Sequence, residues 1–278
     1  MAIPRLSLPN DASVTGMSVV KQDNVYDTYP IHCHEFDELF FIFRGRAIHN
    51  INGQHQVIEK GSLVFIRPDD THCYSPLNNY DFGMYTLGFP PDITRCALDY
   101  SGLEMNSTVF PPQVTVYGAD YTWLENRMER LWLIRSPQRL QLFRAIFPAI
   151  LEMLFGRDNA KQSEAALIPP WLARLEESMR LRENYIAGLD RLLELCPYSQ
   201  EYLNRMFRLY LKTTPTEYIN ARRMTHATEL LLGGEHSITE ICFASGFNNL
   251  SHFYTVFHRM YDCTPKEFVR RMTAEQTR

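Results

Sequence analysis

The sequence predicts an α+β protein in which a β-rich N-terminal part precedes an all-α C-terminal part. Short apolar or alternating runs, separated by glycines and one Asn-Gly pair, indicate antiparallel strands joined by tight turns. Farther along, apolar residues recur with helical spacing, and one helical pattern occurs twice. The chain has 278 residues, of which 45% are hydrophobic, so it is long enough for two domains with separate cores.

Many short antiparallel strands with regular turn signals are typical of a barrel or jelly roll. The β-rich region ends near 111–113, and two helices with apolar stripes are expected next, with a break at Ser136-Pro137. A polar stretch that closes with two prolines follows as the expected linker. We therefore predict a first domain over 1–156, a linker over 157–170 and a second domain over 171–278. The strands are expected at 39–43, 47–51, 55–58 and 62–66, and the helices at 121–135 and 138–155.

The C-terminal repeat relates residues 189–219 to residues 238–269. Each copy predicts a short helix, a sharp turn and a second helix, which is the outline of a helix-turn-helix. In the second copy Ser237 and Glu240 fit a capping box, and the first helix is expected to end near Gly246. A long helix, expected over 215–232, connects the copies. Two such units can place their second helices in successive major grooves of DNA, about 34 Å apart; a duplicated helical bundle is the plainer alternative.

This repeat resembles the DNA-binding domain of the AraC/XylS family of bacterial transcription regulators. There are three departures: Cys242, Asp262 and Val269 stand where the family usually has alanine, glycine and arginine, and the last removes one expected phosphate contact. The residues that carry the resemblance are Ile238, Ile241, Gly246, Phe247, Ser251, Phe253, Phe257, Pro265 and Phe268, with Arg222, Arg223, Met224 and Ala227 on the connecting helix.

By this resemblance, the exposed face of each second helix reads bases, and nearby basic residues contact phosphates. Arginine suits guanine and asparagine suits adenine in the major groove. A solvated helix surface is the alternative for each base reader, and an intradomain ion pair is the alternative for Arg222. The expected base readers are Gln200, Glu201, Asn204, Arg205 and Arg208 in the first copy, and Asn249, Leu250, Ser251, Tyr254 and Thr255 in the second. The expected phosphate contacts are Lys212, Arg222, Arg223, His258 and Arg259.

Charge and cysteine content set broader limits. The net charge is −4, divided into −5 over residues 1–170 and +1 over residues 171–278, so any positive face must come from clustering and non-specific DNA affinity should be modest. No run approaches the ~20 apolar residues of a transmembrane helix, and the N-terminus lacks a signal-peptide pattern. We therefore expect a cytoplasmic protein without a membrane partner. Six cysteines with no CxxC spacing predict reduced thiols.

A second group of residues lies in the β-rich part. On an extended strand His32, His34 and Glu38 share one face, and His72 from a neighbouring strand can complete four ligands for a divalent transition metal such as Zn, Ni, Mn or Fe. The pattern resembles the cupin barrel. Metal ligation, direct hydrogen bonding to a ligand and a purely structural role all stay open. The residues that fit the two cupin motifs are His32, His34, Glu38, Gly45, Gly61 and His72, whereas Arg67 and Asp69 replace the usual proline and glycine.

Cupin-like barrel, helical pair, linker and double helix-turn-helix follow one another as in the sugar-responsive branch of the AraC/XylS family, which includes rhamnose- and chitobiose-type regulators. Residues 32–54, 61–74 and 198–203 carry this resemblance. It implies a barrel that binds a small effector, expected to be a sugar or sugar phosphate, and control of a carbohydrate-utilisation operon through double-stranded DNA. It also implies a homodimer formed by the helical pair, and contact with RNA polymerase if the protein activates. Apart from the metal, no cofactor is expected.

Sugars are usually held by planar hydrogen-bonding groups and aromatic faces, so several strand residues are candidate effector contacts, with plain exposure as the alternative. We expect no enzymatic activity. A metal-dependent cupin isomerase or oxygenase with a DNA-binding tail is one alternative, and a metal- or redox-responsive regulator is the other. The candidate effector contacts are Arg44, Arg46, His49, Asn50 and Tyr85. The candidate dimer or core residues of the helical pair are Leu131, Leu133, Leu142, Phe143, Ile146 and Leu154.

Overall fold

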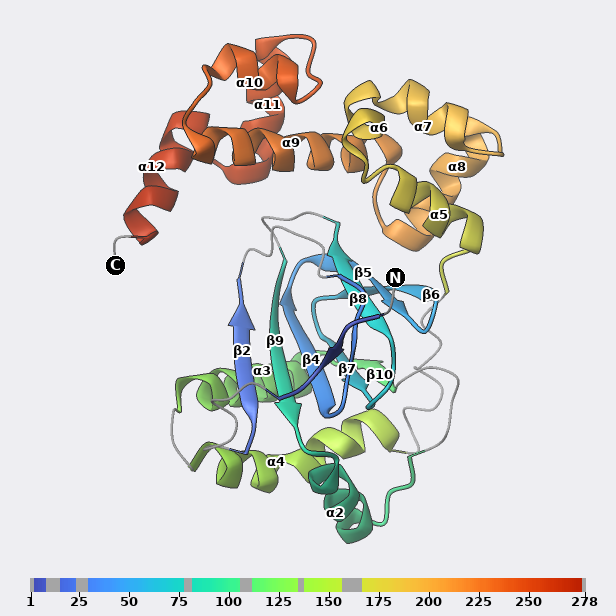
Figure 1. Ribbon diagram of the computed structural model, residues 1–278, viewed down its shortest axis with the longest axis vertical. Helices are drawn as coiled ribbons and strands as arrows, with labels where there is room; N and C mark the ends of the chain where they lie inside the picture. The colour runs from blue at the N-terminus through green and yellow to red at the C-terminus, as the bar shows by residue number, and fades with distance from the viewer. Residues whose placement is uncertain are drawn as a thin grey trace. The chain divides into compact units, whose positions relative to one another are not determined.

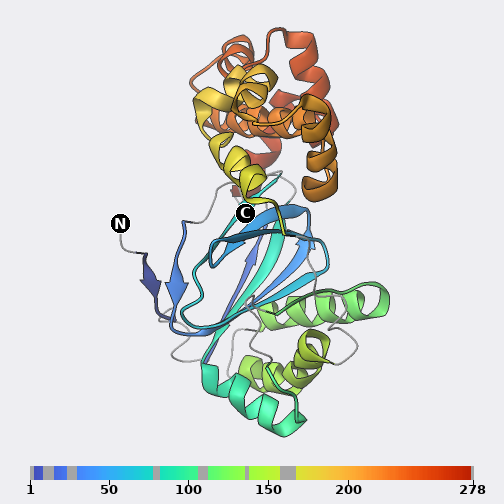
Figure 2. The same ribbon diagram turned by 90° about the vertical axis from the view of Figure 1, so that its right-hand side faces the viewer.

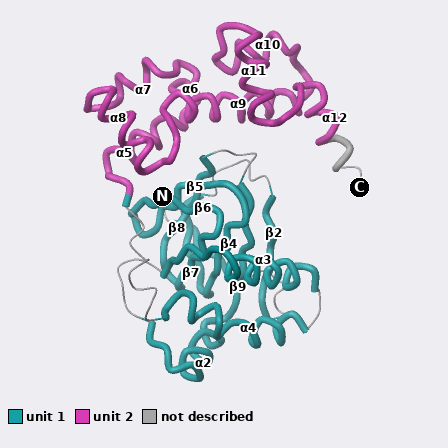
Figure 3. Tube along the Cα trace, turned by 180° about the vertical axis from the view of Figure 1, so that it is seen from behind, with its two compact units in different colours: residues 1–77, 81–167 teal, residues 78–80, 168–278 magenta. Residues whose placement is uncertain are grey.

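The computed structural model describes residues 3–8, 16–23, 30–77, 82–105, 112–134, 138–156 and 167–276. The chain forms two compact units, one that ends at Leu167 and one that runs from Ile168 (Figure 3). The first is β-rich and the second is helical, which confirms the α+β prediction. Most of the expected linker, residues 157–166, lies outside the described residues, as does the expected break at Ser136-Pro137.

The β-rich unit contains two antiparallel sheets and one short parallel pair. The larger sheet has the strand order β10-β7-β4-β9-β2, the smaller has the order β6-β5-β8, and β1 pairs with β3 (Figure 1). Apolar side chains from both sheets, such as Phe40 and Ile58, pack together in one buried cluster, so the sheets face each other. The strands are β1 (Arg5–Leu6), β2 (Ser18–Gln22), β3 (Cys33–His34), β4 (Asp37–Arg44), β5 (Arg46–Ile51), β6 (Gln54–Glu59), β7 (Ser62–Ile66), β8 (His72–Pro76), β9 (Gly83–Phe89) and β10 (Gln113–Thr115).

Strand β4 shows why the central runs are apolar without alternation. Phe40 and Ile42 face the smaller sheet, whereas Leu39 and Phe41 face the opposite side and join the core under the helices. Successive side chains of a strand point to opposite faces, so a strand covered on both sides is apolar throughout. The four expected strands all form, and the expected Asn-Gly turn joins β5 to β6 with both residues at positive φ, 49° for Asn52 and 78° for Gly53.

Three helices, α2 (Pro91–Ser101), α3 (Gly118–Leu133) and α4 (Gln138–Phe155), complete the β-rich unit and lie on one side of its sheets (Figure 2). The sequence predicted α3 and α4 but not α2. Of the candidate dimer or core residues, Leu131, Phe143, Ile146 and Leu154 are buried in the core and Leu142 packs partly against it. Leu133 is 63% exposed and is therefore the one of the six that remains a candidate for contact with a second chain.

The helical unit is organised around α9. Helices α6 and α7 contact one part of α9, and α10, α11 and α12 contact the rest, so each half of the repeat packs on the same connecting helix (Figure 1). Among the described residues, no helix has the length and apolar character needed to cross a bilayer. The helices are α5 (Pro170–Ser178), α6 (Arg182–Ala187), α7 (Leu189–Leu195), α8 (Gln200–Met206), α9 (Pro215–Gly233), α10 (Ile238–Ala244), α11 (Leu250–Tyr261) and α12 (Pro265–Gln276), and a π-helical turn, η3 (Phe207–Leu211), continues α8.

Local signals fix the ends of these helices as the sequence indicated. Ser237 and Glu240 form a complete capping box at α10, and Thr214 and Glu217 form another at α9. The turn after α10 contains Gly246 at φ 85°, where a side chain would be strained. The two copies differ at one unexpected point, because the second helix of the first copy ends in a π-helical turn, whereas α11 stays α-helical. The equivalent residues Lys212 and Asp262 then take the left-handed conformation.

Replacing Ser237 by alanine should lower the free energy of unfolding of the helical unit by about 1 kcal/mol. The Ser237 side chain accepts a hydrogen bond from the Glu240 N–H, and alanine leaves that N–H without its cap. Urea denaturation followed by circular dichroism measures the change. Thr239→Ala is the matched control, because Thr239 is an exposed residue inside the same helix and alanine is the better helix former. Equal stability of both variants would contradict the capping role.

Candidate DNA-binding and effector sites

Helices α8 and α11 each begin at a residue whose side chain caps the first turn. Ser199 accepts from the N–H of Tyr202, and Asn249 accepts from the N–H of His252 at 2.8 Å. Leu203 and Phe207 in the first copy, like Phe253 in the second, are fully buried. The opposite face of each helix is left to solvent, as the sequence predicted. Of the expected readers and phosphate contacts, Gln200, Glu201, Arg205, Arg208, Lys212, Asn249, Ser251, Tyr254, Thr255, His258 and Arg259 are exposed, and Asn204 and Leu250 are half-buried.

Arg222 is buried within the helical unit and does not form part of that outer face. Its guanidinium donates to Glu176 Oε1 at 3.0 Å and to the Tyr218 hydroxyl at 3.2 Å, and its side chain is only 10% exposed. Arg180 pairs with the other Glu176 oxygen at 2.6 Å. These contacts tie α5 to α9. The intradomain ion pair named above as the alternative for Arg222 is therefore what the structure contains.

Arg223, also expected at phosphate, instead links α6, which precedes the first copy of the repeat, to the turn of the second copy. Its guanidinium donates to the backbone carbonyl of Tyr185 at 2.9 Å and to that of Ile186 at 2.6 Å, both at the end of α6. The same guanidinium lies 5.7 Å from the centre of the Phe247 ring, in the turn of the second copy. A Cβ on Gly246 would lie 2.9 Å from the Arg223 Nε, so only glycine leaves room for this side chain.

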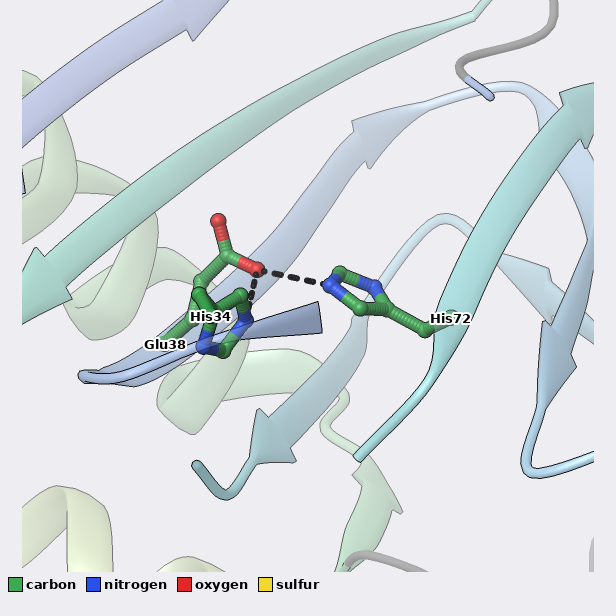
Figure 4. A group of neighbouring side chains, drawn as sticks. All are labelled: His34, Glu38 and His72. Carbon is green, nitrogen blue, oxygen red and sulfur yellow. Dashed lines mark hydrogen bonds and ion pairs between the residues drawn. The ribbon is translucent and has the colours of Figure 1, made fainter. Parts of the chain in front are cut away.

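The β-rich unit brings His34, Glu38 and His72 together, although they lie on three different strands (Figure 4). Glu38 Oε2 is 3.2 Å from His34 Nε2 and 3.5 Å from His72 Nε2. The His72 and His34 rings are fully buried, and Glu38 is 8% exposed. His32 forms an isolated antiparallel bridge with His72, which places their ring centres 4.3 Å apart. The predicted four-residue group therefore gathers in one place.

Two residues of the loop before His72 depart from the cupin motif, and the loop still forms. Asp69, where that fold has glycine, takes φ 69°, the left-handed conformation that asparagine and aspartate tolerate better than most side chains. Arg67 and Asp70 form an ion pair at 3.0 Å within the loop, and the Asp69 N–H donates to the His34 carbonyl at 3.1 Å. These bonds hold β8 beside the strand that carries His34.

The hydrogen bonds of His34 restrict what lies between it and Glu38. Its Nδ1 is 2.7 Å from the carbonyl oxygen of Phe36, and since a carbonyl only accepts, Nδ1 carries a proton. In the neutral ring, Nε2 then presents a lone pair to the Glu38 carboxylate, and two acceptors 3.2 Å apart need a shared proton or cation. Histidines that bind metals usually donate their other ring N–H in the same way. The group is thus equipped to hold a proton or a divalent metal.

Burial lowers the pKa of His32 and His72, and for His72 the neighbouring imidazoles of His49, His32 and His34 lower the pKa further. Burial also lowers the pKa of His49 to about 3. His32, His49 and His72 are consequently neutral at pH 7, the form in which imidazole binds metals and exchanges hydrogen bonds with a ligand.

A cavity of about 180 Å³ opens beside this group, between the larger sheet and β8. Glu38, His32 and His72 form part of its wall. The Tyr74 hydroxyl donates to Gln22 Oε1 at 2.8 Å at another part of the wall, and Thr86 Oγ1 has no hydrogen-bond partner among the described residues. The complete lining is Leu6, Ser18, Val20, Gln22, His32, Phe36, Glu38, Phe40, His72, Tyr74, Thr86 and Gly88.

The tentative effector contacts lie elsewhere. Tyr85 faces the helices, where its hydroxyl donates to Glu129, and Arg44 pairs with Asp23 at 2.7 Å. Arg46 and His49 lie on β5 and do not line the cavity, although the buried His49 ring stands 6.0 Å from that of His72. The sequence missed Ser18, Gln22, Tyr74 and Thr86, because only the pairing of β2 with β9 and of β8 with β5 shows which of their side chains point inward. The six cysteines are free thiols.

Comparison with known proteins finds a match in each of the two units. Residues 15–168 match the AraC-like ligand binding domain, and residues 194–271 match a helix-turn-helix domain. The HTH-type transcriptional activator RhaS of Klebsiella pneumoniae (strain 342) is 29% identical over 252 residues, which cover 86% of this chain and 87% of that protein. The HTH-type transcriptional activator RhaR of Enterobacter sp. (strain 638) is 25% identical over 267 residues, 89% of this chain and 91% of that protein.

Among solved structures, an apo variant of ToxT from Vibrio cholerae strain SCE256 aligns with a TM-score of 0.43 at 17% identity, over 92% of this chain and 97% of that one. The AraC-like ligand binding domain alone spans more than half of the chain, and it is followed by the expected helix-turn-helix. The chain therefore belongs to the AraC family of DNA-binding transcription regulators.

Proposed function

We propose that this regulator binds a small carbohydrate, a sugar or sugar phosphate, in the cavity between its sheets and controls an operon for carbohydrate use. The observation that carries the proposal is the cavity itself, where two histidines, a carboxylate, a tyrosine hydroxyl and an amide converge on an apolar pocket. Sites for drug-sized ligands usually have volumes of about 300–1,000 Å³. The cavity is smaller than this, which favours a small ligand. The barrel on this view binds without catalysis.

The effector acts through a difference in affinity between DNA-binding states of the protein. In this proposal the protein is cytoplasmic and binds DNA as a homodimer. The exposed Leu133 lies at or near the interface between the two chains. RNA polymerase is a further partner if the protein activates. A thermal-shift screen against mono- and disaccharides, their phosphates and divalent metals tests the effector. A ligand present at 100 times its Kd should add about 2.7 kcal/mol of stability. No response to any carbohydrate would overturn the proposal.

Arg205→Ala should weaken binding to the cognate operator by about 1–3 kcal/mol, equivalent to a roughly 5- to 150-fold higher Kd, and should relax preference for one base pair. Arg205 is exposed on α8, and its guanidinium lies 5.1 Å from the centre of the Tyr202 ring, which holds it in place. Fluorescence anisotropy with operators carrying single base-pair changes measures both effects. Arg182→Ala, an exposed arginine on α6, is the control. Equal losses on all sequences would indicate a phosphate contact instead.

A second candidate function, a metal-responsive regulator, is favoured by the His34, Glu38 and His72 group. The three ligand atoms lie within 4.8 Å of one another, and the Phe36 carbonyl fixes His34 in the orientation that a metal ligand needs. Zn, Ni, Mn and Fe are the metals that such a donor set suits. Metal analysis of the purified protein, with His34→Ala and His72→Ala, tests this hypothesis. Operator binding that depends on metal but on no carbohydrate would favour it over the sugar response.

A further inference from the structure

We propose that the cavity selects an uncharged polyhydroxylated effector of monosaccharide size and rejects its phosphorylated form. This proposal rests on the proposed sugar response and decides between the two effector classes that it leaves open. Three observations carry it: the charge of the wall, the partners of the nearby cations, and the positions of the unused polar atoms.

The wall carries one carboxylate and no permanent positive charge. Among the twelve lining residues Glu38 is the one acid, and neither lysine nor arginine is present. A phosphate group brings a charge of about −1.5 to −2 at pH 7 and is normally met by arginine, lysine or a helix N-terminus. Beside the largely buried Glu38 carboxylate, a phosphate would lose its hydration and would also be repelled by the negative charge of that carboxylate.

The cations on the strands that form the wall are all engaged elsewhere. Lys21 alternates with the inward-facing Val20 and Gln22, so it points to the helices and pairs with Glu129 at 2.9 Å. Arg44 pairs with Asp23, and Arg5 pairs with Asp69. The chain segments 9–15, 24–29 and 78–81, which adjoin these strands in the sequence, contain three aspartates and no lysine or arginine. A phosphate in the cavity would therefore have to break an existing ion pair to find a cation.

The polar atoms that remain suit hydroxyl groups. One Glu38 oxygen faces both imidazoles, and the other points away from them (Figure 4). A carboxylate oxygen accepts strong hydrogen bonds from hydroxyls. Thr86 Oγ1 is without a partner among the described residues, and the Gln22 and Tyr74 pair offers further donor and acceptor capacity. Phe36 and Phe40 supply the apolar faces against which the C–H groups of a sugar ring pack.

Matched pairs of ligands test this inference on the full-length protein. Calorimetry compares glucose, galactose, mannose, rhamnose, fucose and N-acetylglucosamine with the corresponding sugar phosphates, and inorganic phosphate serves as a bare anion probe. The protein is dialysed against a chelator first and then assayed again with zinc. The inference expects at least one free sugar to bind, its phosphate to bind at least tenfold more weakly, and inorganic phosphate not to compete.

Glu38→Gln should weaken binding of the free sugar at least tenfold. It should also reduce the ratio between the affinity for the free sugar and the affinity for its phosphate. Glu35→Gln, an exposed carboxylate outside the wall, should leave both values unchanged. Near-ultraviolet circular dichroism establishes that both variants fold. Tighter binding of the phosphate, with or without zinc, would overturn the inference and leave the sugar response standing. Failure of every sugar and every phosphate, with operator binding intact, would overturn the sugar response itself.

Discussion

Glu176→Gln is expected to lower the free energy of unfolding of the helical unit by about 3–5 kcal/mol. Glu176 is 1% exposed and accepts from Arg180, Arg222 and Tyr218, so glutamine leaves two guanidiniums with little solvent contact and no counter-charge. Removing one partner of a buried ion pair generally costs this much. Denaturant unfolding of the variant measures the loss, and Glu177→Gln, its exposed neighbour on α5, is the control. Equal stability of the two variants would contradict the role of the network.

The same network predicts a dependence on pH. Burial alone would raise the pKa of Glu176, but the Arg180 and Arg222 guanidiniums and the Tyr218 hydroxyl outweigh it and hold that pKa below its ordinary value. The stabilisation is therefore complete above the unfolded-state pKa and is lost as the pH falls through the folded-state value. The stability difference between the wild type and Glu176→Gln should shrink on acidification. A difference that grows toward low pH would contradict this sign.

Arg223→Met is expected to destabilise the helical unit by about 2–4 kcal/mol, because two hydrogen bonds from a charged donor to the Tyr185 and Ile186 carbonyls disappear. The second effect is on DNA. Arg223 also lies over Phe247 in the second copy, and α6 packs against α7 of the first copy, so the loss of Arg223 should loosen the spacing between α8 and α11. Operator affinity should fall, and it should become less sensitive to one inserted base pair between the two major-groove sites. Denaturant unfolding and fluorescence anisotropy measure the two effects.

A phosphate contact, the role first expected for Arg223, predicts a different pattern. Folding would then be unchanged, affinity would fall equally on all sequences, and the slope of log affinity against log salt would drop by about 1. Arg223→Lys separates the two roles further. Lysine retains the charge for a phosphate but lacks the planar fork that reaches both carbonyls, so it should restore little stability.

The sequence predicted the helical unit well because its signals are local. The capping box at Ser237 and Glu240 and the positive φ at Gly246 depend on residues within a few positions of one another. The π-helical turn after α8 was not predicted. Residues 200–211, which contain it, have the same length and apolar spacing as residues 250–261, which form the regular helix α11. The base readers on α8 and α11 were expected from the family resemblance; most of them are exposed, and their contacts with bases stay a prediction.

By itself the sequence determined the α+β class, the repeated helix-turn-helix, and the positions of the four consecutive strands β4 to β7, since each rests on side-chain periodicity and turn chemistry that operate along the chain. It also singled out His32, His34, Glu38 and His72. Only the tertiary structure decided which residues share the cavity with them, because inward and outward faces of β2, β8 and β9 follow from strand pairing between distant segments. It likewise decided that Arg222 and Arg223 serve the fold, since their partners Glu176 and Tyr185 are about 40 residues away in the chain.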